Sequence, residues 1–210
     1  MNFFQRFFGI FFNPKKISQT LASNPTWLDA CVILLVVLLG FSYLIVPHTK
    51  MLNGVDNPSW SAILLRSVLL THLYFLEFLV SSLVLLILGR LASRGGNYVQ
   101  VFSLFVYANL IDKILGNAVR LFLMSLNESI FQATTSIAQF FPNMNIHSLG
   151  HAVAVQVDFF HLWLFGVLAF GLAEVFKMKM KKALCVSYGF WLLKAILNTA
   201  LITFGMSIYG

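Results

Sequence analysis

The chain has 210 residues, of which 59% are hydrophobic and 10% charged, and its mean hydropathy is +0.85. Soluble domains carry roughly 25% charged residues, so a water-soluble core cannot hide this much apolar surface. The net charge of +7 does not indicate nucleic acid as a partner, because no dense run of Lys and Arg lies beside aromatic residues in a polar segment. Cys31 and Cys185 fall inside apolar runs and predict no disulfide framework.

The segment NFFQRFFGIFF, residues 2–12, predicts an amphipathic helix. On a helical wheel one half of the circumference is aromatic, and it holds Phe3, Phe4, Phe7, Phe8, Phe11 and Phe12. Pro14 ends the helix, and Lys15 and Lys16 follow. Such a helix lies in the head-group layer with its cations near anionic lipid. We interpret residues 1–26 as an interfacial anchor at the cytoplasmic face; the alternatives are a signal anchor or an ordinary helix on a soluble core.

The remainder of the chain, residues 27–210, predicts one all-α transmembrane domain. Residues 28–46 form 19 positions with a single charge at the edge, enough to cross a hydrocarbon core of about 30 Å. Four further apolar runs follow. The predicted spans are residues 28–46, 61–88, 98–126, 159–176 and 183–209. Between the third and fourth spans, residues 127–157, the polar composition predicts a loop with an interfacial helix around SIFQATTSIAQFF, residues 129–141.

The cations outside the spans alternate along the chain. Before the first span, in the four connections and after the last span, Lys and Arg number 3, 1, 2, 0, 4 and 0. The positive-inside rule converts this alternation into a cytoplasmic N-terminus and an extracytoplasmic C-terminus. An odd number of spans agrees with this result, because it places the two termini on opposite sides of the membrane.

Several ionisable residues fall inside the apolar runs. Each costs several kcal/mol at bilayer depth unless it is paired or faces water. A midplane layer is predicted from Glu77, Asp112, Lys113 and Lys194, with Asn117 and Asn198 on the same helical stripes. A second layer towards the outer side is predicted from Arg66, Arg120, Asp158 and His161.

These charges have two interpretations. In the first, Glu77 and Asp112 neutralise Lys113 and Lys194 and hold the helices together. In the second, the layer lines a proton, ion or solute path, because intramembrane charge is a functional-site hypothesis by default.

Four residues form a weak candidate for a metal site: His147, His151, Asp158 and His161. Their spacing of i, i+4 and i, i+3 suits zinc ligands. The residues between His151 and Asp158 leave the geometry open, however, and no HExxH frame supplies a base. No phosphate loop, nucleophile elbow or activated cysteine is recognisable. We therefore expect no cofactor, no metal and no enzymatic activity.

Three stretches resemble the Ypt-interacting protein (Yip) domain family of five-span membrane proteins, in its shorter bacterial branch. They are FFNPKKISQTLASNPTWLDA (Phe11 to Ala30), GGNYVQVFSLFVYANLIDKIL (Gly95 to Leu115) and VDFFHLWLFGVLAFGLAEVFKMKMKKAL (Val157 to Leu184). The resemblance implies five spans and a cytoplasmic N-terminus. Eukaryotic relatives act in vesicle traffic and bind small GTPases through a cytosolic N-terminal region. That long region and its Asp-Leu-Tyr-Gly-Pro motif are lacking here, so we do not expect GTPase binding.

Taken together, these observations predict a non-enzymatic, multi-pass membrane protein that acts as a membrane-organising or interaction scaffold. The alternative is a small ion or solute transporter that uses the midplane layer, and a membrane zinc site is a third hypothesis. The expected partners are the bilayer, with anionic lipid at the cytoplasmic face, and a second copy or another membrane protein. The expected location is a bacterial inner membrane, or a secretory-pathway membrane in a eukaryote.

Overall fold

The computed structural model describes residues 1–45, 59–127 and 134–209. Within these ranges the chain is helical and forms no β-strand, which confirms the predicted all-α class. Four helical segments are long and apolar enough to cross a membrane: Leu28–Ile45, Ser67–Ala92, Tyr98–Leu126 and Met180–Phe204. The fourth predicted span forms an apolar helix of 17 residues, Phe159–Val175, which is shorter than these four.

The N-terminal segment folds into two short helices, α1 (Phe3–Phe12) and α2 (Pro14–Ser23). The side chain of Asn2 caps α1 by accepting from the Gln5 amide at 2.9 Å, and the Gln5 side chain accepts from the Asn2 amide at 3.2 Å. α1 ends before Asn13, as expected, and Pro14 occupies the first position of α2, where its missing N–H is not needed. The second helix was not predicted. It packs against the bundle through buried Ile17 and Leu21.

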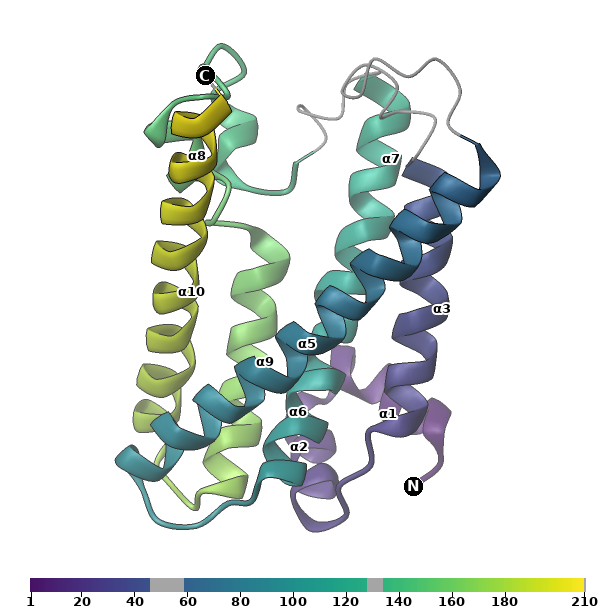
Figure 1. Ribbon diagram of the computed structural model, residues 1–210. Coiled ribbons are helices and arrows are strands. Elements are labelled where there is room, and N and C mark those ends of the chain that lie inside the picture. Colours follow the sequence, from purple (N-terminus) through teal and green to yellow (C-terminus); the bar gives the residue numbers. More distant parts are fainter. Residues whose placement is uncertain (46–58, 128–133, 210) are drawn as a thin grey trace.

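Five longer helical segments alternate in direction (Figure 1). They are α3 (Leu28–Ile45), α5 (Trp60–Ala92), the continuous helix formed by α6 (Tyr98–Leu110), η2 (Ile111–Gly116) and α7 (Asn117–Asn127), then α9 (Phe159–Val175) and α10 (Met180–Tyr209). The α5–α6 and α9–α10 connections lie at the lower end in Figure 1, beside α1 and α2. The C-terminus lies at the opposite end.

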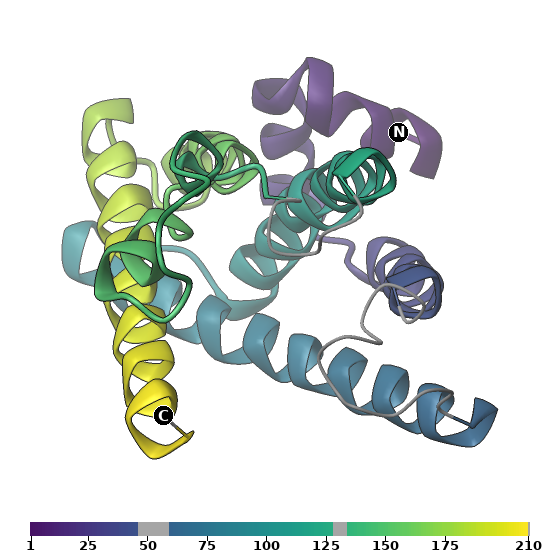
Figure 2. The ribbon, with the colours of Figure 1, turned by 90° about the horizontal axis from the view of Figure 1, so that it is seen from above.

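α6 occupies the centre of the bundle. Every residue from Val101 to Ile111 is buried, as expected for a helix that neighbours surround on all sides. α6 contacts α5, α9, α2 and α3. Viewed from above, α5 runs obliquely along one side of the bundle (Figure 2), and it contacts α3, α6 and α10.

A tight turn joins α5 to α6. Gly95 and Gly96 have φ values of +115° and +67°, a region that residues with a Cβ rarely adopt. A Cβ on Gly96 would also lie 2.7 Å from the ring of Phe176. Asn97 then caps α6, because its side chain accepts from the Gln100 amide at 2.9 Å. The two glycines thus let the chain reverse against the end of α9.

The polar connection before α9 holds a short 3-10 turn, η3 (Ile137–Phe140), and a six-residue helix, α8 (Leu149–Ala154). The described residues of the stretch predicted to form an interfacial helix, 134–141, contain only η3, and α8 lies further along the chain. Residues 128–133, which belong to the same predicted loop, lie outside the described residues.

Candidate functional site

A π-helical turn, η2, interrupts the central helix where its charged residues lie. The Asn117 amide donates to the carbonyl of Asp112, five residues back. Asp112 and Lys113 both lie in this turn, and their side chains are in contact, with Oδ2 and Nζ 2.9 Å apart. Such turns occur often at functional sites.

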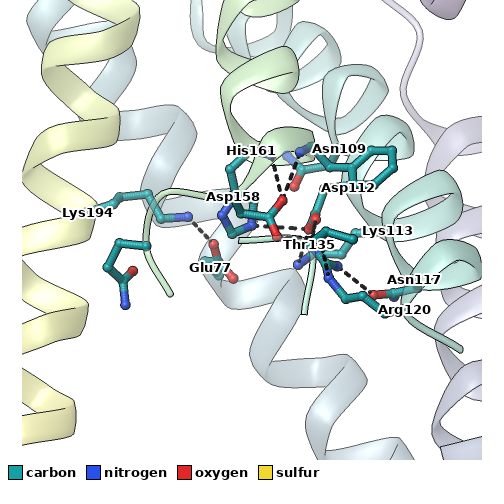
Figure 3. A network of polar contacts seen from close by, with 12 residues as sticks. Glu77, Asn109, Asp112, Lys113, Asn117, Arg120, Thr135, Asp158, His161 and Lys194 are labelled. Carbon is teal, nitrogen blue, oxygen red and sulfur yellow. Dashed lines mark hydrogen bonds and ion pairs between the residues drawn. The ribbon is translucent and has the colours of Figure 1, made fainter. Parts of the chain in front are cut away.

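Asp112 is the hub of the network (Figure 3). Its carboxylate is 1% exposed and meets Lys113, Arg120 and His161. Arg120 Nη2 lies 2.8 Å from Oδ1, and His161 Nε2 lies 3.4 Å from Oδ2. Arg120 reaches back over Gly116, where a Cβ would lie 3.1 Å from Nη1. The glycine therefore leaves room for the ion pair.

Asp158 joins the network to α9. Its Oδ1 caps that helix by accepting from the amides of Phe160, at 2.8 Å, and His161, at 3.2 Å. Its Oδ2 lies 3.0 Å from Arg120 Nη2 and accepts from the Thr135 hydroxyl. Burial acts to raise the pKa of Asp158, which precedes the α9 segment. The Arg120 charge and the hydrogen bonds from Thr135 and Arg120 outweigh burial and hold this pKa below its usual value.

A second ion pair joins α5 to α10. Lys194 Nζ donates to Glu77 Oε1. One turn before Glu77, the ring of Tyr74 lies under Lys113, with Nζ 4.7 Å from the ring centroid. The network contains three acids and three bases: Glu77, Asp112, Asp158, Lys113, Arg120 and Lys194.

The two pairs share one cavity of about 220 Å³ between α5, η2, α9 and α10. All four residues of the predicted midplane layer line it, and His161 and Asn198 line it as well. Asn117 lies outside the cavity and accepts from Arg120 Nη1 at 3.0 Å. The fold thus gathers the four midplane residues from three helical segments around one cavity.

The predicted outer layer is not separate from the midplane layer. Arg120, Asp158 and His161 all connect to Asp112, directly or through one another. Helical spacing alone would leave Arg120 far from Asp112. The length of the Arg120 side chain and the π turn at 111–116 together bring the two residues into contact. The side chain of Arg66 lies outside the described residues.

The four candidate zinc ligands do not meet. Among the described residues, no group of three or more His, Cys, Asp or Glu is arranged to hold a metal ion. Asp158 instead faces Arg120, and His151 lies in α8 with its amide bonded to Ser148 Oγ.

A further polar cluster, which the sequence did not predict, ties α1 to the bundle. Arg6 Nη2 lies 2.6 Å from Asp29 Oδ2, and Arg6 Nε donates to the Tyr107 hydroxyl at 3.0 Å, which itself donates to Asp29. Arg6 therefore points into the bundle and not towards solvent. Asp29 is the residue from which this cluster could have been predicted, because an acid at the edge of an apolar run requires a basic partner.

The six Phe residues of α1 do not all lie on one exposed face. Phe4, Phe8 and Phe12 are exposed, whereas Phe3, Phe7 and Phe11 are partly buried. Phe11 packs edge-on against Trp163 of α9, with ring centroids 6.5 Å apart. The exposed rings recur every four residues and form one edge of α1.

Comparison with protein-family models gives a match to the Yip1 domain over residues 8–202. Comparisons with curated proteins and with solved structures give no match. The family match covers nearly the whole chain and includes the second half of α1, the central helix and the ion-pair network, and it confirms the family resemblance seen in the sequence. The chain therefore belongs to the Yip1 domain family.

Proposed function

We propose that the chain crosses the membrane five times as one domain, residues 27–210, with residues 1–26 at the cytoplasmic face. The alternating directions of the five segments support this topology (Figure 1). So does the charge distribution, because Arg90 in the last turn of α5, Arg94 after it and the lysines between α9 and α10 lie at the end where α1 lies. The 17 residues of α9 extend about 26 Å, a length that slight local bilayer thinning accommodates.

The topology predicts that a reporter fused after Gly210 is extracytoplasmic. A fused alkaline phosphatase, which folds only outside the cytoplasm, should be active, and a fused green fluorescent protein should be dark. The same reporters fused after Arg94, in the α5–α6 connection, should give the opposite pair of signals. A fluorescent C-terminal fusion would contradict the five-span topology.

Within that topology, the function that the geometry supports best is a non-enzymatic scaffold that organises the membrane or binds other membrane proteins. The supporting observation is that all six charged residues of the network pair with one another. Paired charges fix the register of helices more readily than they drive chemistry. The family resemblance adds a role of the kind seen in membrane traffic, and the likeness to the short bacterial branch favours an inner membrane as the location.

The lipid-facing surfaces fit such a role. Phe4, Phe8 and Phe12 are exposed beside Lys15 and Lys16, a combination that binds an interface containing anionic lipid. The outer faces of α3, α5 and α10 expose large aliphatic side chains, available to lipid, to a second copy or to another membrane protein.

A small ion or solute transporter is the second candidate, because the charged layer lines a cavity. Replacing Lys194 by Met separates the two functions. For a scaffold, we expect loss of folded protein, since Glu77 is left without its partner, and no K⁺, Cl⁻ or proton flux through liposomes containing the wild type. Lys182→Met removes an exposed lysine of the same helix and should change neither property.

A measurable wild-type flux that is abolished in well-folded Lys194→Met or Asp112→Asn protein would instead establish the transporter. Folding is assessed by size-exclusion profile and melting temperature in the same detergent, so that loss of flux and loss of structure are recorded separately.

A further inference from the structure

The cavity beside the two ion pairs is polar although it lies at the depth of the apolar helices. Its volume is about 220 Å³. Amide side chains line it together with the charges, namely Asn109, Gln156 and Asn198. A cavity with several converging polar groups is the usual form of a small-molecule site.

The charges around the cavity restrict the ligand. The network contributes three negative and three positive side chains, whose charges cancel. A ligand with net charge would leave that charge uncompensated in a medium of low dielectric constant, which is costly. A zwitterion adds no net charge and still offers each member of an ion pair an opposite partner.

One of the two ion pairs is accessible to such a ligand. The side chains of Glu77 and Lys194 are 36% and 27% exposed, whereas that of Asp112 is 1% exposed. Glu77 and Lys194 come from different helices, α5 and α10, and each has a single ion-pair partner among the described residues. A ligand ammonium at Glu77 and a ligand anion at Lys194 would replace one ion pair by two.

A cluster of buried aromatic rings lies beside the cavity. Phe78, Phe105, Phe165 and Phe190 come from the four helices α5, α6, α9 and α10, and all are buried. Phe105 and Phe190 have ring centroids 6.4 Å apart, and Phe165 and Phe190 are 6.0 Å apart. Each ring lies on the side of the charged layer nearer to α1. Two of these rings, Phe105 and Phe165, line the cavity.

Towards the other end, the cavity adjoins an apolar groove between α8 and α10. Gln156, Trp191 and Ala195 line both hollows. The rest of the groove is mainly aliphatic, and its Thr203 hydroxyl is bonded to the Thr199 carbonyl of its own helix at 2.8 Å. A molecule reaching the cavity from this side passes an apolar wall.

We propose that the cavity binds a small zwitterion that carries a primary ammonium and a singly charged anionic group, held between Glu77 and Lys194. The same chemistry occurs in free solutes and in the head group of phosphatidylethanolamine. This proposal requires only the cavity. It is independent of whether the chain acts as a scaffold or as a transporter.

The test uses purified full-length protein at neutral pH. Glycerophosphoethanolamine, the zwitterionic head group without its acyl chains, should raise the melting temperature in a saturable manner. Glycerophosphoglycerol, with one net negative charge, and ethanolamine, with one net positive charge, should bind at least about tenfold more weakly, a difference of about 1.4 kcal/mol. Equal binding of either charged analogue would contradict the proposal.

Two variants locate the binding. Glu77→Gln/Lys194→Gln removes the accessible pair at constant net charge and should weaken binding at least about tenfold. Glu174→Gln/Lys182→Gln removes one acid and one base outside the cavity and should bind as the wild type does. Ala195→Leu keeps every charge but places a larger side chain in the wall shared by the cavity and the groove, so it should also prevent binding. Undiminished binding to folded Ala195→Leu protein would place the ligand elsewhere and overturn the proposal.

Measurements in lipid nanodiscs distinguish a lipid head group from a free solute as the ligand. If the ligand is a lipid head group, phosphatidylethanolamine should stabilise the wild type more than phosphatidylglycerol does, and Ala195→Leu should remove the difference. If the soluble head group stabilises the protein while the two lipids act equally, the ligand is a free solute. Failure of both the head group and the lipid to stabilise the protein would refute zwitterion binding.

Discussion

Replacing Asp112 by Asn is expected to lower the free energy of unfolding by about 3–5 kcal/mol, the usual cost of removing one partner from a buried ion pair. The carboxylate is 1% exposed and contacts Lys113 and Arg120 at 2.9 and 2.8 Å. An amide of the same shape leaves these cations without their shared counter-charge. The loss is measured by chemical denaturation in detergent micelles, or as a fall in the yield of folded protein.

Two further variants test the cause. Glu174→Gln removes an acid whose side chain accepts from Gln19 at 3.0 Å, and it should cost less than about 1 kcal/mol. Asp112→Asn/Lys113→Gln removes a base together with the acid and should recover part of the loss. If Asp112→Asn unfolds within about 1 kcal/mol of the wild type, the hub carries no structural role.

Replacing Gly89 by Ala is expected to lower the free energy of unfolding by about 1–3 kcal/mol through overpacking. A Cβ at this position in α5 would overlap the ring of Phe176, which is fully buried at the end of α9. The ring cannot move aside without disturbing the α5–α6 turn, where it also lies close to Gly96. Thermal melting of the purified protein measures the effect.

Gly40 supplies the matched control. It lies in α3, and no atom lies within 4 Å of the position that a Cβ would take there, so Gly40→Ala should stabilise the helix by up to about 1 kcal/mol. Adding Phe176→Leu to Gly89→Ala should restore part of the lost stability, because it removes the clash. Equal melting temperatures for Gly40→Ala and Gly89→Ala would argue against close packing of α5 on α9.

Much of the fold follows from local patterns in the sequence. Apolar runs predict the long helices, because a helix in lipid must satisfy its backbone internally, and Pro14 marks the end of α1. α2 escaped prediction because its ten residues have low overall hydrophobicity, and its buried side includes only Ile17, Ser18 and Leu21. Its helical state depends on packing against α6 and α9, which local sequence does not specify.

The candidate site was only partly predictable for similar reasons. Helical spacing brought Asp112, Lys113 and Arg120 onto one broad stripe, but such spacing assumes an α-helix throughout and has no signal for the π turn at 111–116. Helical spacing also does not indicate how far a side chain extends from its helix. Arg120 extends back to Asp112, and Arg6 extends inward to Asp29; long cationic side chains follow their counter-charge rather than the face that a helical wheel gives them.

The balance of three acids and three bases has an electrical consequence. A membrane voltage does work only on displaced net charge, about 2.3 kcal/mol for each elementary charge moved through 100 mV. Because Glu77, Asp112 and Asp158 offset Lys113, Arg120 and Lys194, a rigid shift of this network through the bilayer is electrically silent. A membrane voltage therefore exerts no net force on these six charges taken together.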